Sequence, residues 1–411
     1  MSKSNFKKFI LLWSGELISA IGGGLTSFGL GVYVFEKTGS AAGMAIVTLL
    51  GFLPTLVLSI PAGVIADRYD RRVLMMLGDG GSAIGIIYIL ICMLRGEVSL
   101  VQICIGVFIS SVFSALLEPA YKATVSDLLT PEEYSKASGL VSLAGSARYL
   151  VSPVIAGILL SVSDVKLLLV IDICTFFLTV ISTFVVKKGL KESKVSEQVS
   201  FKESLKTGWN AICKKRGVLL LVLVSALLTL FIGTFQILAE PLILSISNAK
   251  TLGIAETICA SGMLVSSLFI GFFGIKSKYV KILSLSLAFA GLFIFAFGMF
   301  KTVPFITAAG FGFFMMLPFA NTCLDYLVRT NTDKELQGRI WGFIGFLSQI
   351  GYVIAYGCSG ILADSIAKVR NISVGRGAGV VVSVAGVALI ILSIVMLFIK
   401  DIKKLDSEIE G

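Results

Sequence analysis

The sequence predicts an all-α integral membrane protein whose twelve transmembrane helices form two six-helix halves. Of its 411 residues, 56% are hydrophobic and only 15% are charged, and the mean hydropathy is +0.95. Soluble domains average about 45–50% apolar and about 25% charged residues. The apolar residues also gather in continuous stretches of about the 20 residues that a spanning helix needs. Such stretches do not alternate as barrel strands do, so helices are the expected spanning structure.

Twelve stretches meet this length. The first follows Lys3, Lys7 and Lys8, as the apolar core of a signal peptide follows basic residues, but it is longer than such a core. We therefore expect it to be the first spanning helix. The predicted spans lie near residues 9–35, 41–65, 73–94, 98–121, 137–162, 167–186, 218–244, 252–275, 282–300, 303–328, 340–363 and 377–399.

The basic residues predict the orientation of the chain. Of the 35 lysine and arginine residues, 26 fall in the two tails and the even-numbered loops, eight fall in the opposite loops, and Arg148 lies within a span. Because basic loops stay on the cytoplasmic side, we expect a multi-pass protein of the cell membrane with both termini in the cytoplasm. The opposite loop that contains Lys368, Arg370 and Arg376 fits this pattern least well.

The longest polar segment divides the chain. We expect a six-helix bundle at 1–186, a cytoplasmic linker at 187–217 and a second six-helix bundle with a short tail at 218–411. The linker is basic and contains Phe201, Trp209 and Ile212, which suit a helix lying on anionic lipid. A plain solvated linker is the alternative. A shift of 199 positions aligns Pro119 with Pro318, as a parallel repeat of two halves would.

Several classes of function are excluded by what the sequence lacks. It has no histidine, which removes histidine-based catalysis and the usual zinc sites. It also has no Walker A pattern, so direct use of ATP is excluded. We expect no enzymatic activity, no catalytic residues, no metal and no cofactor. Because the positive charge follows the membrane topology, we expect membrane lipids rather than nucleic acid as its partner.

The turn between the second and third spans contains a recognisable motif. Residues 63–72 read GVIADRYDRR, which matches the G-x-x-x-D-R-x-x-R-[RK] signature at every fixed position. The chain thereby resembles the major facilitator superfamily. That resemblance implies a cytoplasmic latch that faces the start of the eleventh helix, around Gly338, Arg339 and Trp341. The basic residues could also pair with Asp127. The latch residues are Gly63, Asp67, Arg68, Arg71 and Arg72.

Four short stretches resemble the macrolide-efflux type of drug/proton antiporter within that superfamily. They are Phe35–Ser40, Gly51–Pro54, Val151–Pro153 and Ile171–Asp172. The fifth span also contains a degraded form of the antiporter motif G-P-x-x-G-G, in which serine replaces the first glycine. The residues of this helix-five motif are Ser152, Pro153 and Gly157.

Ionisable residues inside the spans are the main functional candidates, because each costs at least about 2.5–3.5 kcal/mol at membrane depth. The resemblance implies that helices one, four, seven and ten line the substrate cavity. Arg148 could pair with Glu16, our first choice, or with Asp172; Asp79 is a further buried acid. Structural ion pairs or helix-end acids are the alternative. The candidates for proton coupling or substrate binding are Glu16, Glu118, Arg148, Asp172, Glu240 and Asp325.

These features together predict secondary active efflux of lipophilic drugs, macrolide-like or multidrug, driven by proton influx through alternating access. A small lipophilic or cationic substrate and protons are the expected partners, and the chain is expected to act as a monomer. The alternatives are export of a siderophore, peptide or lysolipid, an uptake permease, and a membrane sensor without transport.

Overall fold

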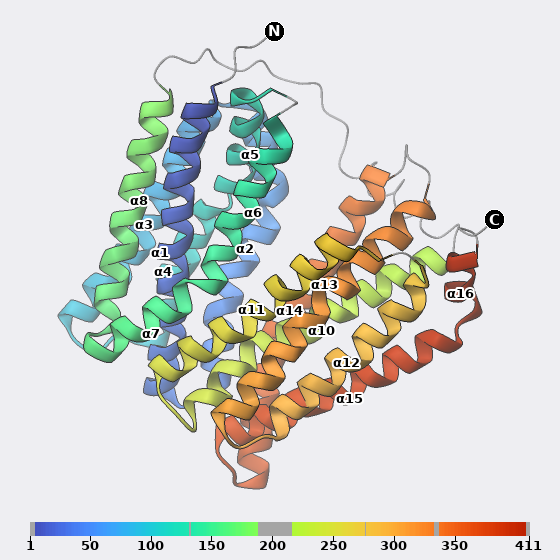
Figure 1. The fold of residues 1–411 in the computed structure, drawn as a ribbon. Coiled ribbons are helices and arrows are strands. Elements are labelled where there is room, and N and C mark those ends of the chain that lie inside the picture. Colours follow the sequence, from blue (N-terminus) through green and yellow to red (C-terminus); the bar gives the residue numbers. More distant parts are fainter. Residues whose placement is uncertain (1–4, 131–132, 188–215, 276, 333–336, 408–411) are drawn as a thin grey trace. The chain divides into compact units, whose positions relative to one another are not determined.

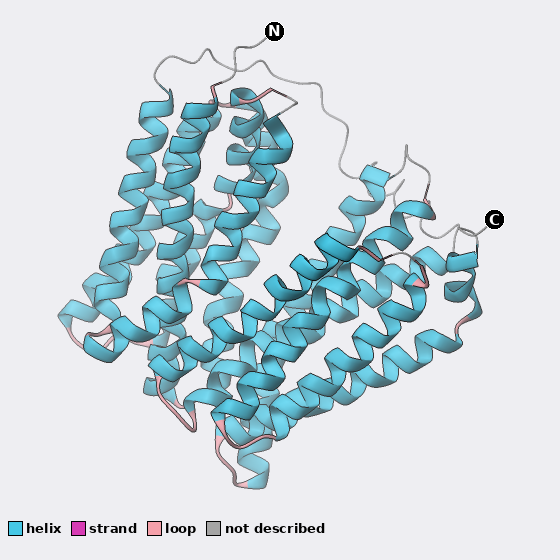
Figure 2. Cartoon of the chain, in the orientation of Figure 1, coloured by secondary structure: helices cyan, strands magenta, loops and turns pink. Residues whose placement is uncertain are grey.

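The computed structural model describes residues 5–130, 133–187, 216–275, 277–332 and 337–407, and regular structure in these ranges is entirely helical (Figure 2). Twelve helical segments are long and apolar enough to cross a membrane, which confirms the predicted fold class. The linker at 187–217, with its expected surface helix, lies almost wholly outside the described residues.

The helices follow one another along the chain as Figure 1 shows. They are α1 (Phe6–Thr38), α2 (Ala41–Arg68), α3 (Arg71–Arg95), α4 (Leu100–Ser114), α5 (Leu117–Leu128), α6 (Tyr134–Leu150), α7 (Ser152–Val162), α8 (Val165–Lys187), α10 (Arg216–Leu244), α11 (Ala249–Phe273), α12 (Tyr279–Met299), α13 (Val303–Thr330), α14 (Gln337–Arg370), α15 (Val374–Phe398) and α16 (Lys400–Ser407).

Two of the predicted spans are each made of two helices. The fourth span, Leu100–Leu128, contains α4 and α5, and the fifth, Lys136–Val162, contains α6 and α7. The break in the fifth span falls at Val151, just before Pro153 at the start of α7. Proline fits the first turn of a helix because its missing N–H would have no partner there. The motif residues Ser152 and Pro153 therefore begin a new helix.

The chain forms two compact units. Unit 1 consists of Met1–Gly39, Ile46–Glu197 and Ala249–Ile254, and unit 2 consists of Ser40–Ala45, Gln198–Asn248 and Ala255–Gly411. In unit 1, α1 packs against α8, and α3 packs against α4 and α8. In unit 2, α12 packs against α13 and α15, and α10 packs against α14. Unit 2 also includes the start of α2, where the amides of Ala41 and Ala42 donate to Asp364 of α14.

Helices α1 and α8 lie against each other through small residues spaced seven apart. A Cβ added at Gly15 would come within 2.5 Å of Ser182 Oγ, and one at Gly29 within 2.6 Å of Leu168 Cδ1. Midway between them, a Cβ at Gly22 would meet Thr175, and it would come within 2.8 Å of Asp172 Oδ1. Glycines that repeat along one face let two membrane helices approach closely. This close approach brings Asp172 against α1.

Unit 2 contains a similar seam between α12 and α15. The hydroxyls of Ser284 and Ser393 each donate to the other residue's carbonyl at 2.8 Å. Farther along the pair, a Cβ at Gly291 would come within 2.7 Å of the Gly386 carbonyl oxygen. The seam continues at Gly379, where an added Cβ would come within 2.6 Å of the carbonyl oxygen of Gly298. The spacing is again seven residues on each helix.

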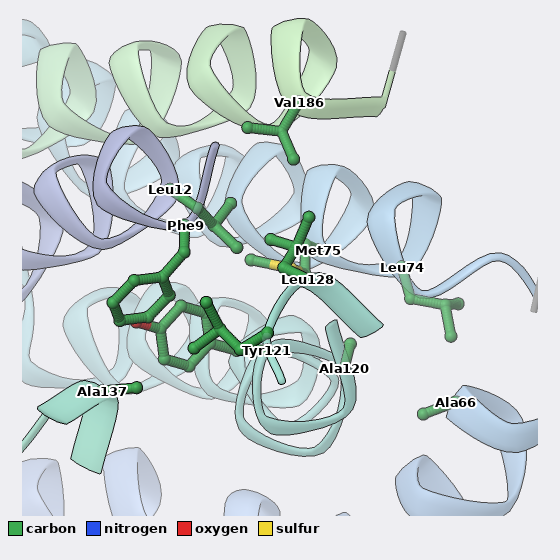
Figure 3. Packing of buried hydrophobic residues seen from close by; sticks show 11 residues of the cluster. Phe9, Leu12, Ala66, Leu74, Met75, Ala120, Tyr121, Leu128, Ala137 and Val186 are labelled. Carbon is green, nitrogen blue, oxygen red and sulfur yellow. The ribbon is translucent and has the colours of Figure 1, made fainter. Parts of the chain in front are cut away.

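A hydrophobic cluster packs between α1, α3, α5, α6 and α8 in unit 1 (Figure 3). Phe9 and Leu12 of α1 and Met75 of α3 are wholly buried in it, and Tyr121 of α5 packs with them. Close packing of such side chains holds membrane helices together through van der Waals contact. The next turn of α1 carries Glu16 and the next turn of α3 carries Asp79, so the polar site begins where this cluster ends.

Candidate functional site

The turn after α2 is held by its charged residues. Asp70 accepts a hydrogen bond from the backbone N–H of Arg72 at 3.0 Å and so caps α3. Arg71 forms an ion pair with Asp127 of α5 at 2.6 Å, and Arg72 lies 3.7 Å from the same carboxylate. The predicted pairing of these arginines with Asp127 is therefore confirmed. It ties the start of α3 to the end of α5.

The other residues of the motif at 63–72 are Gly63, Asp67 and Arg68. A Cβ at Gly63 would meet no atom within 4 Å among the described residues. Arg68 is exposed. The side chain of Asp67 lies outside the described side chains, as do those at the start of α14 that it was expected to face. The latch remains a prediction.

Three acidic side chains gather in the interior of unit 1. They are Glu16 of α1, Asp79 of α3 and Asp172 of α8, and the charges of Glu16 and Asp172 both act on Asp79. Asp79 and Asp172 are 0% and 1% exposed, and Glu16 is partly buried with one oxygen, Oε2, enclosed and without a hydrogen-bond partner. Like charges in a buried site disfavour joint ionisation. The cluster is thus suited to bind protons or another cation.

Arg148 is the basic residue beside this cluster. Its guanidinium donates a hydrogen bond to the hydroxyl of Ser27 on α1 at 3.1 Å, and its charge acts on Asp172. Among the described residues it forms no ion pair within 4.0 Å. The geometry therefore favours Asp172, the second predicted partner, over Glu16. Asp172 also accepts a hydrogen bond from Thr175 at 3.3 Å.

The helix-five motif residues lie at contacts rather than in an open site. Ser152 is fully buried, and its hydroxyl donates to the carbonyl of Ile21 on α1 at 3.0 Å. A Cβ at Gly157 would come within 2.7 Å of the carbonyl oxygen of Ala249, in the first turn of α11. A Cβ at Gly253 would likewise meet the carbonyl of Pro153. The motif thus lets α7 pack closely against both α1 and the start of α11.

Two predicted cavity residues form local ion pairs, and the charge of one of them, Glu118, also acts on Glu16. Glu118 pairs with Lys122 at 2.6 Å, and Asp325 pairs with Arg329 at 2.7 Å. Both pairs join residues four apart on one helix, and all four side chains are exposed. Exposed pairs of this kind contribute little to stability. The structure brings neither acid together with Asp79 or Asp172.

Unit 2 contains a second acidic site, which includes a residue that the sequence analysis missed. Glu240 of α10 has an enclosed oxygen, Oε2, without a hydrogen-bond partner, and the charge of Glu256 on α11 acts on it. One turn before Glu240, Gln236 accepts a hydrogen bond from the Tyr356 hydroxyl at 2.9 Å. Both acids are partly buried. A pair of partly buried carboxylates can attract a cationic group.

Membrane-spanning helices that contain buried ionisable groups are typical of polytopic proteins that move ions or solutes. The sequence model described as Major Facilitator Superfamily matches residues 12–356, so the chain belongs to that superfamily. This match confirms the family that the motif at residues 63–72 predicted.

Individual relatives and a solved structure agree with this assignment. The chain is 27% identical to the macrolide efflux protein A of Streptococcus pyogenes, over 98% of each chain. It is 24% identical to the staphyloferrin A transporter of Staphylococcus aureus, over 65% of this chain and 66% of that protein. A bacterial homologue of the iron transporter ferroportin, solved in an inward-facing state, has the same fold, with a TM-score of 0.73, 15% identity and coverage of 95% of this chain and 100% of that one.

Proposed function

We propose that this transporter exports lipophilic drugs, macrolide-like or multidrug, and that proton influx drives the export through alternating access. The observation that carries the proposal is the cluster of Glu16, Asp79 and Asp172 inside unit 1, with Arg148 beside it. The full-length similarity to a protein named for macrolide efflux supports the choice of substrate.

The chemistry of the cluster suits proton coupling. An ionised carboxylate in a buried site bears a desolvation penalty that protonation removes. Protonation of one acid also frees its neighbours from like-charge repulsion and changes how strongly each holds Arg148. If the inward- and outward-facing states hold these protons with different affinities, a proton gradient shifts the balance between the states. Proton flow into the cell is then coupled to the reorientation of the transporter.

The proposal gives the site residues different roles. Glu16 and Asp172 carry protons, and Arg148 interacts with Asp172 when that acid is ionised. Glu240 holds the cationic group of the substrate. Glu118 and Asp325 remain candidates at the ends of their helices, where their ion pairs must open before they could bind anything. The loop with Asp67 acts as the latch, the chain works as a monomer, and both termini face the cytoplasm of the cell.

The direct test compares drug susceptibility of cells with and without the chain across a panel of macrolides, other lipophilic drugs and lipophilic cations. The wild-type chain should lower susceptibility to several of them, and Asp67→Asn at an equal membrane level should confer less protection. In inverted vesicles, drug uptake should require an acidic interior and stop when an ionophore collapses the pH gradient. Drug uptake that persists in vesicles without any gradient would contradict proton coupling.

A second candidate is export of another small molecule, such as a siderophore, which the similarity to a staphyloferrin A transporter favours. Export of a peptide or lysolipid and an uptake permease are further alternatives on the same fold. Including iron chelators, peptides and lysolipids in the vesicle assay separates them, because an uptake permease would concentrate its substrate in right-side-out vesicles instead. A membrane sensor would move none of these compounds.

A further inference from the structure

An apolar groove on unit 2 has no part in the proposed export. It lies between α10 and α15 and reaches α16, with a volume of about 170 Å³, and all nine residues that line it are leucine, valine, isoleucine or methionine. Pockets for drug-sized molecules are larger, about 300–1,000 Å³, and contain a few polar groups that fix the ligand. The groove therefore fits one hydrocarbon chain better than it fits a transported substrate.

The groove has a sealed floor and an open mouth. Met396 of α15 and Ile402 of α16 are 1% and 0% exposed, whereas Leu223 of α10 and Val395 of α15 are 45% and 49% exposed. Both α10 and α15 are long and apolar enough to span the membrane. The acyl chains of the bilayer are as apolar as this lining. A lipid chain can therefore enter the groove without leaving any polar group unpaired.

The position of α16 is fixed by close contact with the start of α10. A Cβ added at Gly217 would come within 2.7 Å of the carbonyl oxygen of Asp401 and within 2.9 Å of Leu405 Cδ2. Leu405 and Ile402, three residues apart on α16, are both buried. Ile399, which alone separates α15 from α16, also lines the groove. The start of α10, the end of α15 and the start of α16 therefore meet at one end of the groove (Figure 1).

Two exposed basic residues lie at this end of the groove. Arg216 begins α10, one turn before Leu220 of the lining, and Lys400 directly follows Ile399. Among the residues that the structure describes, neither forms an ion pair within 4.0 Å. The neighbouring Asp401 is partly buried, and α16 as a whole contains three lysines and two aspartates. An apolar groove with a basic end is complementary to an amphiphile with a negative headgroup.

We propose that this groove binds one anionic phospholipid, whose acyl chain lies along the apolar lining and whose charged headgroup lies against Arg216 and Lys400. The predicted orientation places this end of α10 and α15 in the cytoplasmic leaflet, where anionic lipids attract basic residues. The bound lipid joins the first turn of α10 to α16 and stabilises both. Lipid binding does not depend on which substrate the protein exports.

The test measures the thermal stability of the purified, delipidated full-length protein, because a ligand that binds only the folded state raises its stability. Three additions are compared: phosphatidylglycerol, phosphatidylcholine with the same acyl chains, and glycerol phosphate, which is a headgroup without chains. Phosphatidylglycerol should raise the unfolding temperature most and phosphatidylcholine less, and glycerol phosphate should have no effect. Native mass spectrometry should show one phosphatidylglycerol retained more strongly than the rest.

The headgroup contact is tested by the double variant Arg216→Gln with Lys400→Gln. It should bind phosphatidylglycerol roughly ten- to thirtyfold more weakly, since each basic residue near an anionic surface contributes about fivefold, and its affinity for phosphatidylcholine should not change. Lys250→Gln with Lys301→Gln is the matched control, because it removes the same charge from two exposed lysines of the opposite loops. The control should bind both lipids as the wild type does.

The apolar contact is tested separately by Leu223→Trp, whose larger side chain should fill the groove and weaken the binding of both lipids. Leu285→Trp on α12 is its control, because Leu285 is also 45% exposed but lies outside the groove. These two variants test the groove even if the double charge variant does not fold.

The proposal is overturned if the two lipids stabilise the wild type equally, or if Leu223→Trp and the double charge variant bind phosphatidylglycerol as their controls do. It is also overturned if a lipophilic drug protects the wild type as well as phosphatidylglycerol and Leu223→Trp removes that protection, or if light scattering shows a dimer that only Leu223→Trp disrupts. Absence of drug export with an intact response to phosphatidylglycerol would reject only the proposed function.

Discussion

Arg148 on α6 donates a hydrogen bond to Ser27 on α1 at 3.1 Å, which places the guanidinium within electrostatic reach of Asp172. The basic residue in the middle of a span is thereby fixed by a neutral hydroxyl and left free of a close ion pair. The guanidinium of Arg148 can therefore lose and regain its interaction with Asp172 during a transport cycle, because no short salt bridge has to be broken first.

We predict that Arg148→Ala abolishes proton-driven efflux in the pH-gradient assay. It should also lower expression, because the buried Asp172 loses its positive neighbour. The double variant Arg148→Ala with Asp172→Asn should recover more folded protein than the double with Glu16→Gln, as measured by fluorescence-detected size exclusion. Normal efflux by Arg148→Ala would reject the coupling role, and better recovery with Glu16→Gln would show that Glu16 is the partner.

The seam between α1 and α8 predicts opposite effects at two adjacent glycines. Gly22→Ala should destabilise the protein by about 1–3 kcal/mol, since the new methyl group meets Thr175 and Asp172. Gly23→Ala should be neutral or stabilising by up to about 1 kcal/mol, because a Cβ there meets no atom within 4 Å and alanine favours the helix. Thermal unfolding in detergent checks both. Equal midpoints would argue against the close helix contact.

The ion pairs after α2 predict a structural role for Asp127. Asp127→Asn should lower stability by about 1–3 kcal/mol, because Arg71 and the nearly buried Arg72 lose their charged partner. Asp164→Asn removes an acid from an exposed pair and should cost less than about 1 kcal/mol. Thermal unfolding again provides the measurement. If the two variants unfold alike, the contacts of Asp127 are no stronger than an ordinary surface pair.

The acidic pair of unit 2 predicts selectivity for charge in the substrate. Glu240→Gln should reduce export of lipophilic cations about tenfold or more while export of neutral lipophilic compounds changes little, since the lost attraction acts only on a charged group. Glu256→Gln should produce a weaker effect in the same direction. Competition assays in inverted vesicles measure both. Equal losses for neutral and cationic compounds would assign Glu240 a structural role.

The orientation predicted from the basic residues can be tested by labelling single cysteines in a cysteine-free background with a reagent that does not cross the membrane. Cysteines placed in both tails and within 187–217 should react only after the membrane is permeabilised. A cysteine at Lys37, in the exposed last turn of α1, should react in intact cells. Labelling of the linker from outside would overturn the twelve-span topology.

The fold could be predicted almost completely from hydropathy, because a bilayer requires long apolar helices and the chain provides twelve. The breaks within the fourth and fifth spans were not predicted, since the apolar composition continues across Ala115 and Val151. A hydropathy profile reports the solvent around a segment, whereas a helix break depends on local backbone geometry.

The site was predicted in part, for equally physical reasons. Counting residues from the membrane edge ranks an acid by depth but does not show which way it faces, so Asp79 was not distinguished from acids that prove exposed. The pairs Glu118–Lys122 and Asp325–Arg329 could have been recognised from their spacing of four residues. Glu256 was missed because it lies only seven residues after the start of α11 and reads as a helix-end acid.

The glycine seams also have a consequence for how this chain can change through evolution. At Gly22 an added methyl group meets the side chain of Thr175, so a larger residue at position 22 requires a smaller one at position 175. At Gly291 and Gly386 an added methyl group meets backbone atoms of the facing helix, so no change of side chain there can make room. Among relatives, position 22 should therefore change together with position 175, whereas positions 291 and 386 should stay glycine. The first seam joins the first and sixth spans and the second joins the ninth and twelfth, so the two halves would differ in how freely their paired helices can vary despite their common plan.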